Sequence, residues 1–159
     1  MQDARQKVRV PAMDPRVARN IAHYSHGHDR DRFGEPIMDH VERVAAAVPD
    51  EARAVAFLHD VLEQTATSGA ELMAQGLTAV EMRALKLLTR SDLESYELYV
   101  LRVAWARGPE GELARCVKMA DLDDHLGHAP KPAAAPPYGW ARRHIRVAQE
   151  RQRTSAAAA

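Results

Sequence analysis

The stretch AFLHDVLEQTA, residues 56–66, places a histidine and an aspartate side by side in an otherwise apolar run. Neighbouring residues of an α-helix point about 100° apart, so His59 and Asp60 can both reach one ion lying beside the helix. Glu63 follows His59 by four residues and Asp60 by three, and it therefore shares their face. The same stretch also fits a plain helix whose histidine and aspartate are solvated, because His-Asp pairs are common by chance.

Apolar residues recur every three to four positions through most of the chain, which is the spacing of one helix face. Over residues 37–48, for example, Val41 and Val44 share such a face. Thr78, followed three residues later by Glu81, is typical of a capping box at a helix start. Alanine and leucine favour helix, and no strand pattern is convincing, so we predict an all-α domain, a bundle of about seven helices. The helical segments cover residues 15–25, 37–48, 51–64, 70–75, 79–89, 95–107, 110–126 and 138–153.

Segments of different composition mark the ends of this domain. Residues 1–13 are predicted to be a flexible leader, residues 14–153 the domain, and residues 154–159 a disordered tail. A Pro/Ala-rich linker, HAPKPAAAPP over 128–137, precedes the last helix. Its prolines lack the N–H donor of a regular helix, so this linker should be irregular.

Composition excludes several classes of protein. The 159 residues include 22 basic and 22 acidic ones, and this zero net charge argues against a general nucleic-acid binder. No apolar run reaches the length of a membrane span, and the opening MQDARQKVRVPAMD lacks the apolar core of a secretory signal. The single Cys116 lies in an apolar run, as expected of a buried thiol in a reducing cytoplasm. We therefore expect a cytoplasmic protein without nucleic-acid or membrane partners, and no sequence signal indicates an oligomeric state.

Two distant residues strengthen the case for a metal site at His59 and Asp60. His40 lies at the start of an apolar-faced helix in IMDHVERVA, and Asp121 lies near the end of another in ARCVKMADLDDHL. A buried carboxylate needs a partner or a metal ion. Two imidazoles and two carboxylates form a mixed nitrogen and oxygen set that suits Mn, Fe or Zn better than Ca.

The order H…HD…D, formed by His40, His59-Asp60 and Asp121, resembles that of the HD-domain phosphohydrolase superfamily. The stretches AHYSHGHDRDRFGEPIMDHVERVA, FLHDVLEQT and ARCVKMADLDDHL are similar to segments of RelA/SpoT-type (p)ppGpp hydrolases. LLTRSDLESYELYVLRVA is similar to a segment often found between those motifs in small stand-alone members. Each motif alone is weak, but four in the same order over residues 22 to 127 make the resemblance specific.

This resemblance implies an all-helical HD domain that binds one divalent ion, usually manganese, with Fe, Zn, Co, Ni or Mg as alternatives. Its ligands would be His40, His59, Asp60 and Asp121. The ion would activate a water molecule that attacks phosphorus, and a nearby carboxylate would orient the water or move protons. In the alarmone hydrolases, this reaction releases pyrophosphate from the 3′ position of a guanosine nucleotide.

Two positions depart from the pattern of those hydrolases. Their Glu-Asp pair after the HD motif matches Glu63 and Gln64 here. Glu63 keeps a catalytic carboxylate, whereas Gln64 can hydrogen-bond but cannot accept a proton at ordinary pH. Their asparagine near the last motif matches His125, which could donate a hydrogen bond, titrate near pH 7 or point to solvent.

Basic residues that could contact a substrate lie in two other segments. In the resembled family, basic residues just before the Gly-Glu-Pro sequence contact the nucleotide, and Arg30 and Arg32 occupy this region here. A guanidinium can stack on a base or grip a phosphate, although a solvated polar loop would look the same. The last helix, WARRHIRVAQERQR, could meet a phosphate-rich ligand or an acidic partner, but its arginines also fit a solvated face.

The sequence thus predicts a metal-dependent phosphohydrolase acting on a nucleotide or related phosphate ester, with (p)ppGpp as the first candidate. Its expected partner is a small phosphorylated molecule. The expected catalytic residues are Glu63 and Gln64, and the expected substrate-binding residues are Arg30, Arg32 and His125. The neutral side chain at position 64 keeps a second hypothesis open, a metal-containing nucleotide-binding or sensor module with weak or no turnover. A third is a scaffold in which the metal only ties helices together.

Overall fold

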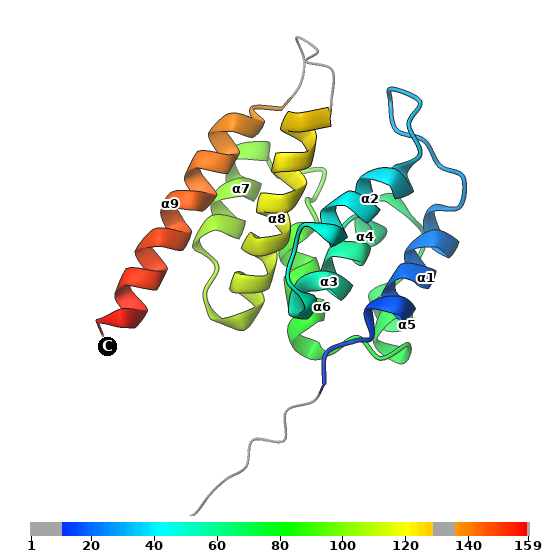
Figure 1. Ribbon diagram of the computed structural model, residues 1–159, viewed down its shortest axis with the longest axis horizontal. Coiled ribbons are helices and arrows are strands. Elements are labelled where there is room, and N and C mark those ends of the chain that lie inside the picture. The colour runs from blue at the N-terminus through cyan, green and yellow to red at the C-terminus, as the bar shows by residue number, and fades with distance from the viewer. Residues whose placement is uncertain (1–10, 129–135, 159) are drawn as a thin grey trace, which may run out of the picture.

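The computed structural model describes residues 11–128 and 136–158, and these segments form an all-α bundle (Figure 1), as predicted. The one β-type pairing within them is an isolated bridge between Arg30 and Pro36, which closes the loop after the first helix. The helices in the described residues are α1 (Pro15–His26), α2 (Ile37–Ala46), α3 (Asp50–Leu58), α4 (Val61–Gln64), α5 (Gly69–Ala74), α6 (Ala79–Leu88), α7 (Tyr96–Trp105), α8 (Gly108–His128) and α9 (Tyr138–Ala157).

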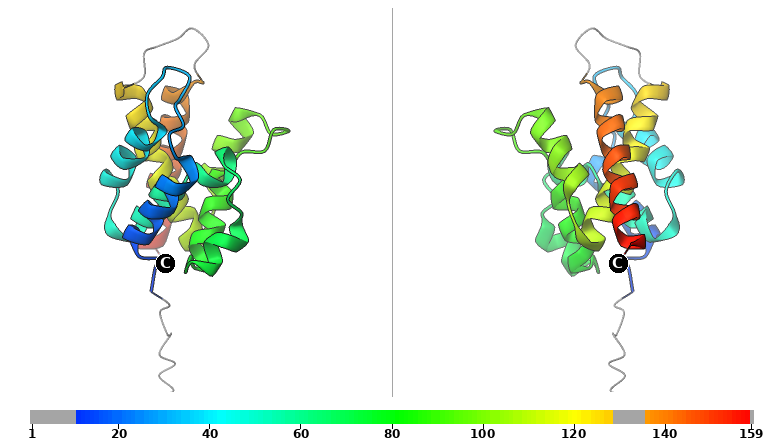
Figure 2. Two further views of the ribbon diagram at one scale, coloured as in Figure 1. Left: turned by 90° about the vertical axis from the view of Figure 1, so that its right-hand side faces the viewer. Right: turned by 90° about the vertical axis from the view of Figure 1, so that its left-hand side faces the viewer.

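Helix α8 runs through the middle of the bundle and packs against α2, α3, α6, α7 and α9. The helices α1 to α5 lie on one side of it, and α7 and α9 lie on the other (Figure 1). The C-terminal end of α8, the start of α9 and the loop between α1 and α2 gather at one end of the molecule (Figure 2). The described N-terminal residues and the end of α9 lie at the opposite end.

The predicted helix over 51–64 is broken in two. Helix α3 ends at Leu58, and α4 begins at Val61 after a turn formed by His59 and Asp60. The 3.5 Å hydrogen bond from the His59 N–H to the Ala56 carbonyl replaces the α-helical pairing at this point. This break divides one predicted segment into two, so the eight predicted segments, the short one over 70–75 included, correspond to nine helices in the described residues.

The predicted capping box at the start of α6 is confirmed. The Thr78 hydroxyl accepts from the Glu81 N–H and the Glu81 carboxylate accepts from the Thr78 N–H. Helix α8 begins before the predicted segment 110–126, because Gly108 and Pro109 open it. A proline fits the first turn of a helix, where its missing N–H has no intrahelical partner to lose.

The two ends of the domain also differ from the prediction. Residues 1–10 of the predicted leader lie outside the described residues, but Met13 is buried and its N–H donates to the buried Glu81 carboxylate over 3.0 Å. Helix α9 continues to Ala157, into the predicted tail, because alanine is the best helix former. Most of the predicted Pro/Ala linker, residues 129–135, lies outside the described residues.

Small residues let α1 pack closely against α3. The buried face of α1 consists of Ala18, Ala22 and His26, and the His26 side chain is only 1% exposed. Neither ring nitrogen of His26 has a hydrogen-bond partner in the described residues.

Cys116, predicted to be a buried thiol, is half-buried on α8.

Helices α7 and α8 form a tight hairpin. Gly111 lies so close to the Ala106 carbonyl oxygen that a Cβ atom at this position would clash with it. The buried Arg115 guanidinium donates to the carbonyls of Ala104 and Ala106 at the end of α7. These contacts fix α7 beside the first turns of α8.

Across the described residues, no helix has the length and apolarity that crossing a lipid bilayer requires.

Candidate metal centre and active site

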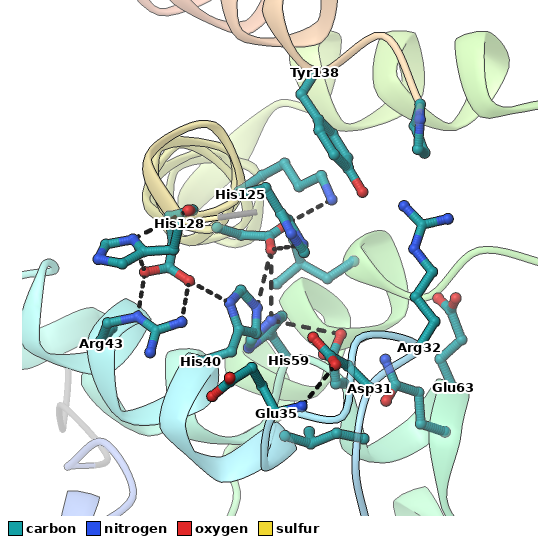
Figure 3. A pocket seen from close by; sticks show the side chains of 18 of the residues that line it. Asp31, Arg32, Glu35, His40, Arg43, His59, Glu63, His125, His128 and Tyr138 are labelled. Carbon is teal, nitrogen blue, oxygen red and sulfur yellow. Dashed lines mark hydrogen bonds and ion pairs between the residues drawn. The ribbon is translucent and has the colours of Figure 1, made fainter. Parts of the chain in front are cut away.

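Three of the predicted metal ligands meet between α2, α3 and α8 (Figure 3). His40 comes from the first turn of α2, His59 from the turn after α3, and Asp121 from the C-terminal half of α8. One ligand atom from each of them lies within 4.8 Å of the other two. His59 and Asp121 are buried and His40 is nearly so. The fold therefore brings together residues that are far apart in the sequence.

The hydrogen bonds of the two histidines determine which nitrogen of each faces this centre. His59 Nδ1 lies 2.7 Å from the Ala56 carbonyl oxygen, and His40 Nδ1 lies 2.7 Å from Asp124 Oδ2. Both oxygens can only accept, so each Nδ1 carries a proton and donates. Each Nε2 is buried and makes no hydrogen bond within the described residues. Both imidazoles thus direct Nε2 at the centre.

Both Nε2 atoms converge on one oxygen of Asp121. Oδ1 of Asp121 lies 3.2 Å from His40 Nε2 and 3.9 Å from His59 Nε2. His125 Nε2, one turn further along α8, lies 3.1 Å from the same oxygen. The other oxygen, Oδ2, accepts from Lys118 Nζ over 2.6 Å. Two imidazole nitrogens and a carboxylate oxygen at these distances fit a divalent transition metal.

Contacts among the buried ionisable groups of this centre keep them in their charged forms. Burial alone would raise the pKa of Asp121, but the Lys118 ammonium and the histidines hold it well below its usual value. Burial would likewise lower the pKa of Lys118, yet Asp121 raises it well above the usual value. Burial also opposes protonation of His40, but Asp121 and Asp124 outweigh it and raise the pKa of His40 to about 10. A metal ion at Nε2 would therefore have to displace a proton.

Asp60, the fourth predicted ligand, lies at the edge of this centre. Its Oδ1 atom is 3.4 Å from His59 Nε2, but it does not belong to the compact group formed by His40, His59 and Asp121. Its side chain is 23% exposed and faces the cavity, so it has room to turn. Coordination by Asp60 stays a prediction.

Glu63 and Gln64 lie on α4 beside the same cavity. The backbone N–H of Arg90, in the loop between α6 and α7, donates to Glu63 Oε2 over 2.9 Å. This bond ties Glu63 to a second segment of the chain. Both predicted catalytic residues are thus close to the centre without belonging to the group of three ligands.

The centre opens into a cavity of about 780 Å³, and the predicted substrate-binding arginines line its wall. Arg30 donates to the Gly34 carbonyl over 2.6 Å, so part of its guanidinium stabilises its own loop. The Arg32 guanidinium lies 4.9 Å from the centroid of the Phe33 ring. Figure 3 shows Arg32 and the Tyr138 hydroxyl facing each other across the cavity. The α1–α2 loop and the start of α9 therefore form opposite walls.

His125 joins the metal centre to the start of α9. Its ring lies parallel to that of Tyr138, with the centroids 4.7 Å apart and the planes inclined by 6°. Of the alternatives open for His125, the structure supports a position in the site, because its Nε2 contacts Asp121. Tyr96 also lines this wall, and its buried hydroxyl has no hydrogen-bond partner in the described residues. Burial raises the pKa of Tyr96 to about 12, so its hydroxyl keeps its proton as a donor.

Several residues of the site were not predicted from the sequence. Asp124 binds His40 and Arg43, and Tyr138 stacks on His125. Asp124 could have been found from its spacing, because it follows Asp121 by three residues and shares its face of α8. No local signal pointed to Tyr138, which reaches the site only because α9 packs against α7 and α8.

Of the comparisons with known proteins, the one with solved structures found a match to this fold. No protein-family model and no curated protein sequence matches the chain. Among solved structures, one match is described as a metazoan ortholog of SpoT that hydrolyzes ppGpp and plays a role in starvation responses. It aligns with a TM-score of 0.61 and 19% sequence identity, over 85% of this chain and 84% of that chain. At this identity the match shows a shared fold, and membership of the HD-domain superfamily and of its RelA/SpoT-type family stays a prediction.

Proposed function

We propose that this protein is a divalent-metal-dependent phosphohydrolase that acts on a nucleotide-like phosphate ester. The observation that carries the proposal is the convergence of the His40 and His59 Nε2 atoms on Asp121 Oδ1, at the floor of a cavity that Arg30, Arg32 and Arg90 help to line. The SpoT ortholog that shares the fold hydrolyzes ppGpp. The first substrates to test are therefore ppGpp and pppGpp.

His40, His59 and Asp121 would hold the ion, and Asp60 would complete the set by turning its carboxylate inward. A divalent ion bound there would supply Lewis-acid activation of a water molecule and of the phosphoryl group. Lys118 contributes by gripping Asp121 Oδ2, which leaves Oδ1 directed at the centre. His59 and His40 present fixed nitrogen atoms because their Nδ1 protons are already bonded.

Glu63 is the best-placed general base of the chain. Its Oε2 accepts from the Arg90 N–H, which leaves Oε1 available to a water molecule in the cavity. As the water oxygen bonds to phosphorus and the ester P–O bond breaks, Glu63 would take up a proton of the water, and the departing ester oxygen would take up a proton from Glu63 or from solvent to leave as the alcohol. Gln64 can orient the water or the substrate through its amide but cannot take this proton.

Basic side chains on the cavity wall would bind the phosphates and the base of the substrate. Arg32 and Arg90 line the cavity and make no salt bridge within the described residues, so their charge is available to an anion. Tyr138, whose ring is stacked on His125, directs its hydroxyl toward Arg32. A guanidinium and a hydroxyl on opposite walls can both donate hydrogen bonds to a phosphate group between them.

The proposal is tested by measuring phosphate and pyrophosphate release from ppGpp, pppGpp and a panel of nucleotides, with the purified protein loaded with Mn²⁺. His59→Ala should abolish turnover by removing a ligand, whereas His23→Ala should not, because His23 lies exposed on α1 and contacts Glu42. Glu63→Gln should lower kcat about 100-fold while Mn²⁺ affinity stays unchanged. If the wild-type protein releases nothing from any compound, the hydrolase proposal is wrong.

Gln64 supports a second candidate, a nucleotide-binding or sensor module with weak or no turnover. Its amide occupies the position where a second carboxylate would assist proton transfer. Calorimetry with ppGpp and Mn²⁺ separates the two candidates. Tight binding without product formation would support the sensor module, and product formation would support the hydrolase.

A further inference from the structure

The Asp124 carboxylate, one turn beyond the metal ligand Asp121 on α8, is only 9% exposed and is surrounded by donors. Its Oδ2 accepts from His40 Nδ1 over 2.7 Å and from Arg43 Nη2 over 3.0 Å. Its Oδ1 accepts from Arg43 Nε over 2.6 Å and lies 3.1 Å from His128 Nδ1. Both carboxylate oxygens are therefore occupied by neighbouring side chains.

The bond to His40 sets the direction of that imidazole. Because a carboxylate only accepts, it keeps a proton on His40 Nδ1 and directs Nε2 at Asp121 and His59, where a metal ion would bind by displacing the Nε2 proton. His59 obtains the same orientation from the backbone carbonyl of Ala56, which is present whatever the side chain at position 56. Only at His40 does the orientation depend on a side chain, that of Asp124.

Arg43 prevents Asp124 from becoming a ligand itself. Its guanidinium grips both carboxylate oxygens through Nε and Nη2, and such a fork holds the carboxylate in one plane. Arg43 follows His40 by one turn of α2, so both of these donors come from α2 and meet one acceptor on α8. This contact also sets the position of α2 relative to α8, and hence that of His40 relative to Asp121.

We infer that Asp124 is a positioning residue of the metal centre, which aims His40 Nε2 at the ion and clamps α2 against α8. A hydrogen-bonded carboxylate behind a ligating histidine fixes its ring and strengthens its bond to the metal. The inference rests on the metal site of the proposed function and is independent of the hydrolysis. Asp124 lies behind His40 and does not belong to the group formed by His40, His59 and Asp121.

The test compares two neighbouring carboxylates of α8. Asp124→Ala should weaken Mn²⁺ binding by about 10- to 100-fold in calorimetry, and the near-isosteric Asp124→Asn should weaken it less. Asp123→Asn is the matched control, because Asp123 is exposed and pairs with Arg142 of α9, away from the metal centre. The visible spectrum of the Co²⁺-loaded protein should change in both Asp124 variants and remain that of wild type in Asp123→Asn.

Each outcome decides the inference. Wild-type Mn²⁺ affinity, within twofold, and an unchanged Co²⁺ spectrum in the Asp124 variants would overturn it. Should Asp124→Ala fail to fold by circular dichroism, the near-isosteric Asp124→Asn decides by the same two measurements. A wild-type protein that binds Mn²⁺ but hydrolyses nothing would contradict the proposed hydrolase and leave this inference standing. A wild-type protein that binds no metal would overturn both.

Discussion

Gln64 is the residue on which we expect the level of the proposed activity to depend. It lies beside Glu63 on α4 and lines the same cavity, so a carboxylate at this position would be within reach of a bound substrate. Its amide donates and accepts hydrogen bonds but takes no proton at neutral pH. The proton transfer that a second acid would provide is therefore missing from this site.

Gln64→Asp should raise the rate of ppGpp hydrolysis about tenfold, because it adds a second group that can accept a proton. The change is measured as kcat with the Mn²⁺-loaded protein, and Mn²⁺ affinity should stay at the wild-type value. Gln75→Asp, at the exposed end of α5, is the matched control and should leave the rate unchanged. An unaltered rate in Gln64→Asp would show that position 64 takes no part in the chemistry.

His26 is buried in α1 with both ring nitrogens unpartnered in the described residues. Burial lowers the pKa of His26 below its ordinary value of 6.5, and the nearby Asp60 only partly opposes this. The unfolded chain therefore binds a proton at a higher pH than the folded protein does. The contribution of the neutral His26 to the free energy of unfolding is therefore fully present above pH 6.5. It is lost as the pH falls below that value, because protonation then favours the unfolded chain.

His26→Phe should remove this pH dependence while keeping a ring in the same space. Between pH 7 and pH 5, the free energy of unfolding of the metal-free protein should fall less in His26→Phe than in wild type, by on the order of 1 kcal/mol. Urea unfolding in EDTA at each pH measures this. His23→Phe, at an exposed position three residues earlier on α1, should retain the wild-type pH dependence, and equal slopes in all three proteins would contradict the prediction.

At the scale of elements, the hairpin of α7 and α8 depends on the absence of a side chain at one position. Gly111 faces the Ala106 carbonyl, and Arg115 donates to the same carbonyl from the next turn of α8. This carbonyl lies just beyond the last residue of α7, where a helix leaves its acceptors unsatisfied. The Ala106 carbonyl is therefore both the atom group that Gly111 packs against and the acceptor that Arg115 caps.

Gly111→Ala should destabilise the protein by about 2 kcal/mol or more, because the new Cβ would clash with a backbone oxygen rather than with a movable side chain. The matched control is Gly127→Ala, in the last turn of the same helix, where a Cβ meets open space. That change should leave stability unchanged or raise it by up to about 1 kcal/mol. Chemical denaturation of both variants measures the difference, and equal stabilities would refute the role of Gly111.

Across the whole molecule, the candidate metal centre joins elements that are distant in the sequence. His40 belongs to α2, His59 to the turn between α3 and α4, and Asp121 to α8, the helix around which the bundle is built. An ion held by all three residues would bind the folded chain and not the unfolded one. Metal binding should therefore stabilise the fold whether or not the protein turns a substrate over.

Removing the metal should lower the stability of the whole domain. At a free Mn²⁺ concentration 100 times Kd, the stabilisation should be about 2.7 kcal/mol, seen as a higher melting temperature that EDTA reverses. Asp121→Asn should abolish the shift, and Asp123→Asn should keep it, because Asp123 faces α9 rather than the centre. A wild-type melting temperature that does not respond to Mn²⁺ would mean that the site binds no ion.

Much of the fold could be predicted because helix formation depends on local spacing. The capping box of Thr78 and Glu81 forms as predicted, and Val41 and Val44 are buried as their spacing indicates. The break at His59 and Asp60 could not be predicted, because the local pattern there continues as a helix. Glu81 also binds Met13, at the end of the predicted leader, and only long-range packing makes that contact.

By itself, the sequence determined that the chain is helical and supplied the candidate ligands His40, His59 and Asp121, since residue type and spacing act locally. The tertiary structure decided which nitrogen of His40 faces the centre, that Asp124 lies behind His40, and that Tyr138 stacks on His125. The physical reason is that these contacts join α2, α8 and α9. Their geometry follows from how the helices pack, and no local spacing encodes it.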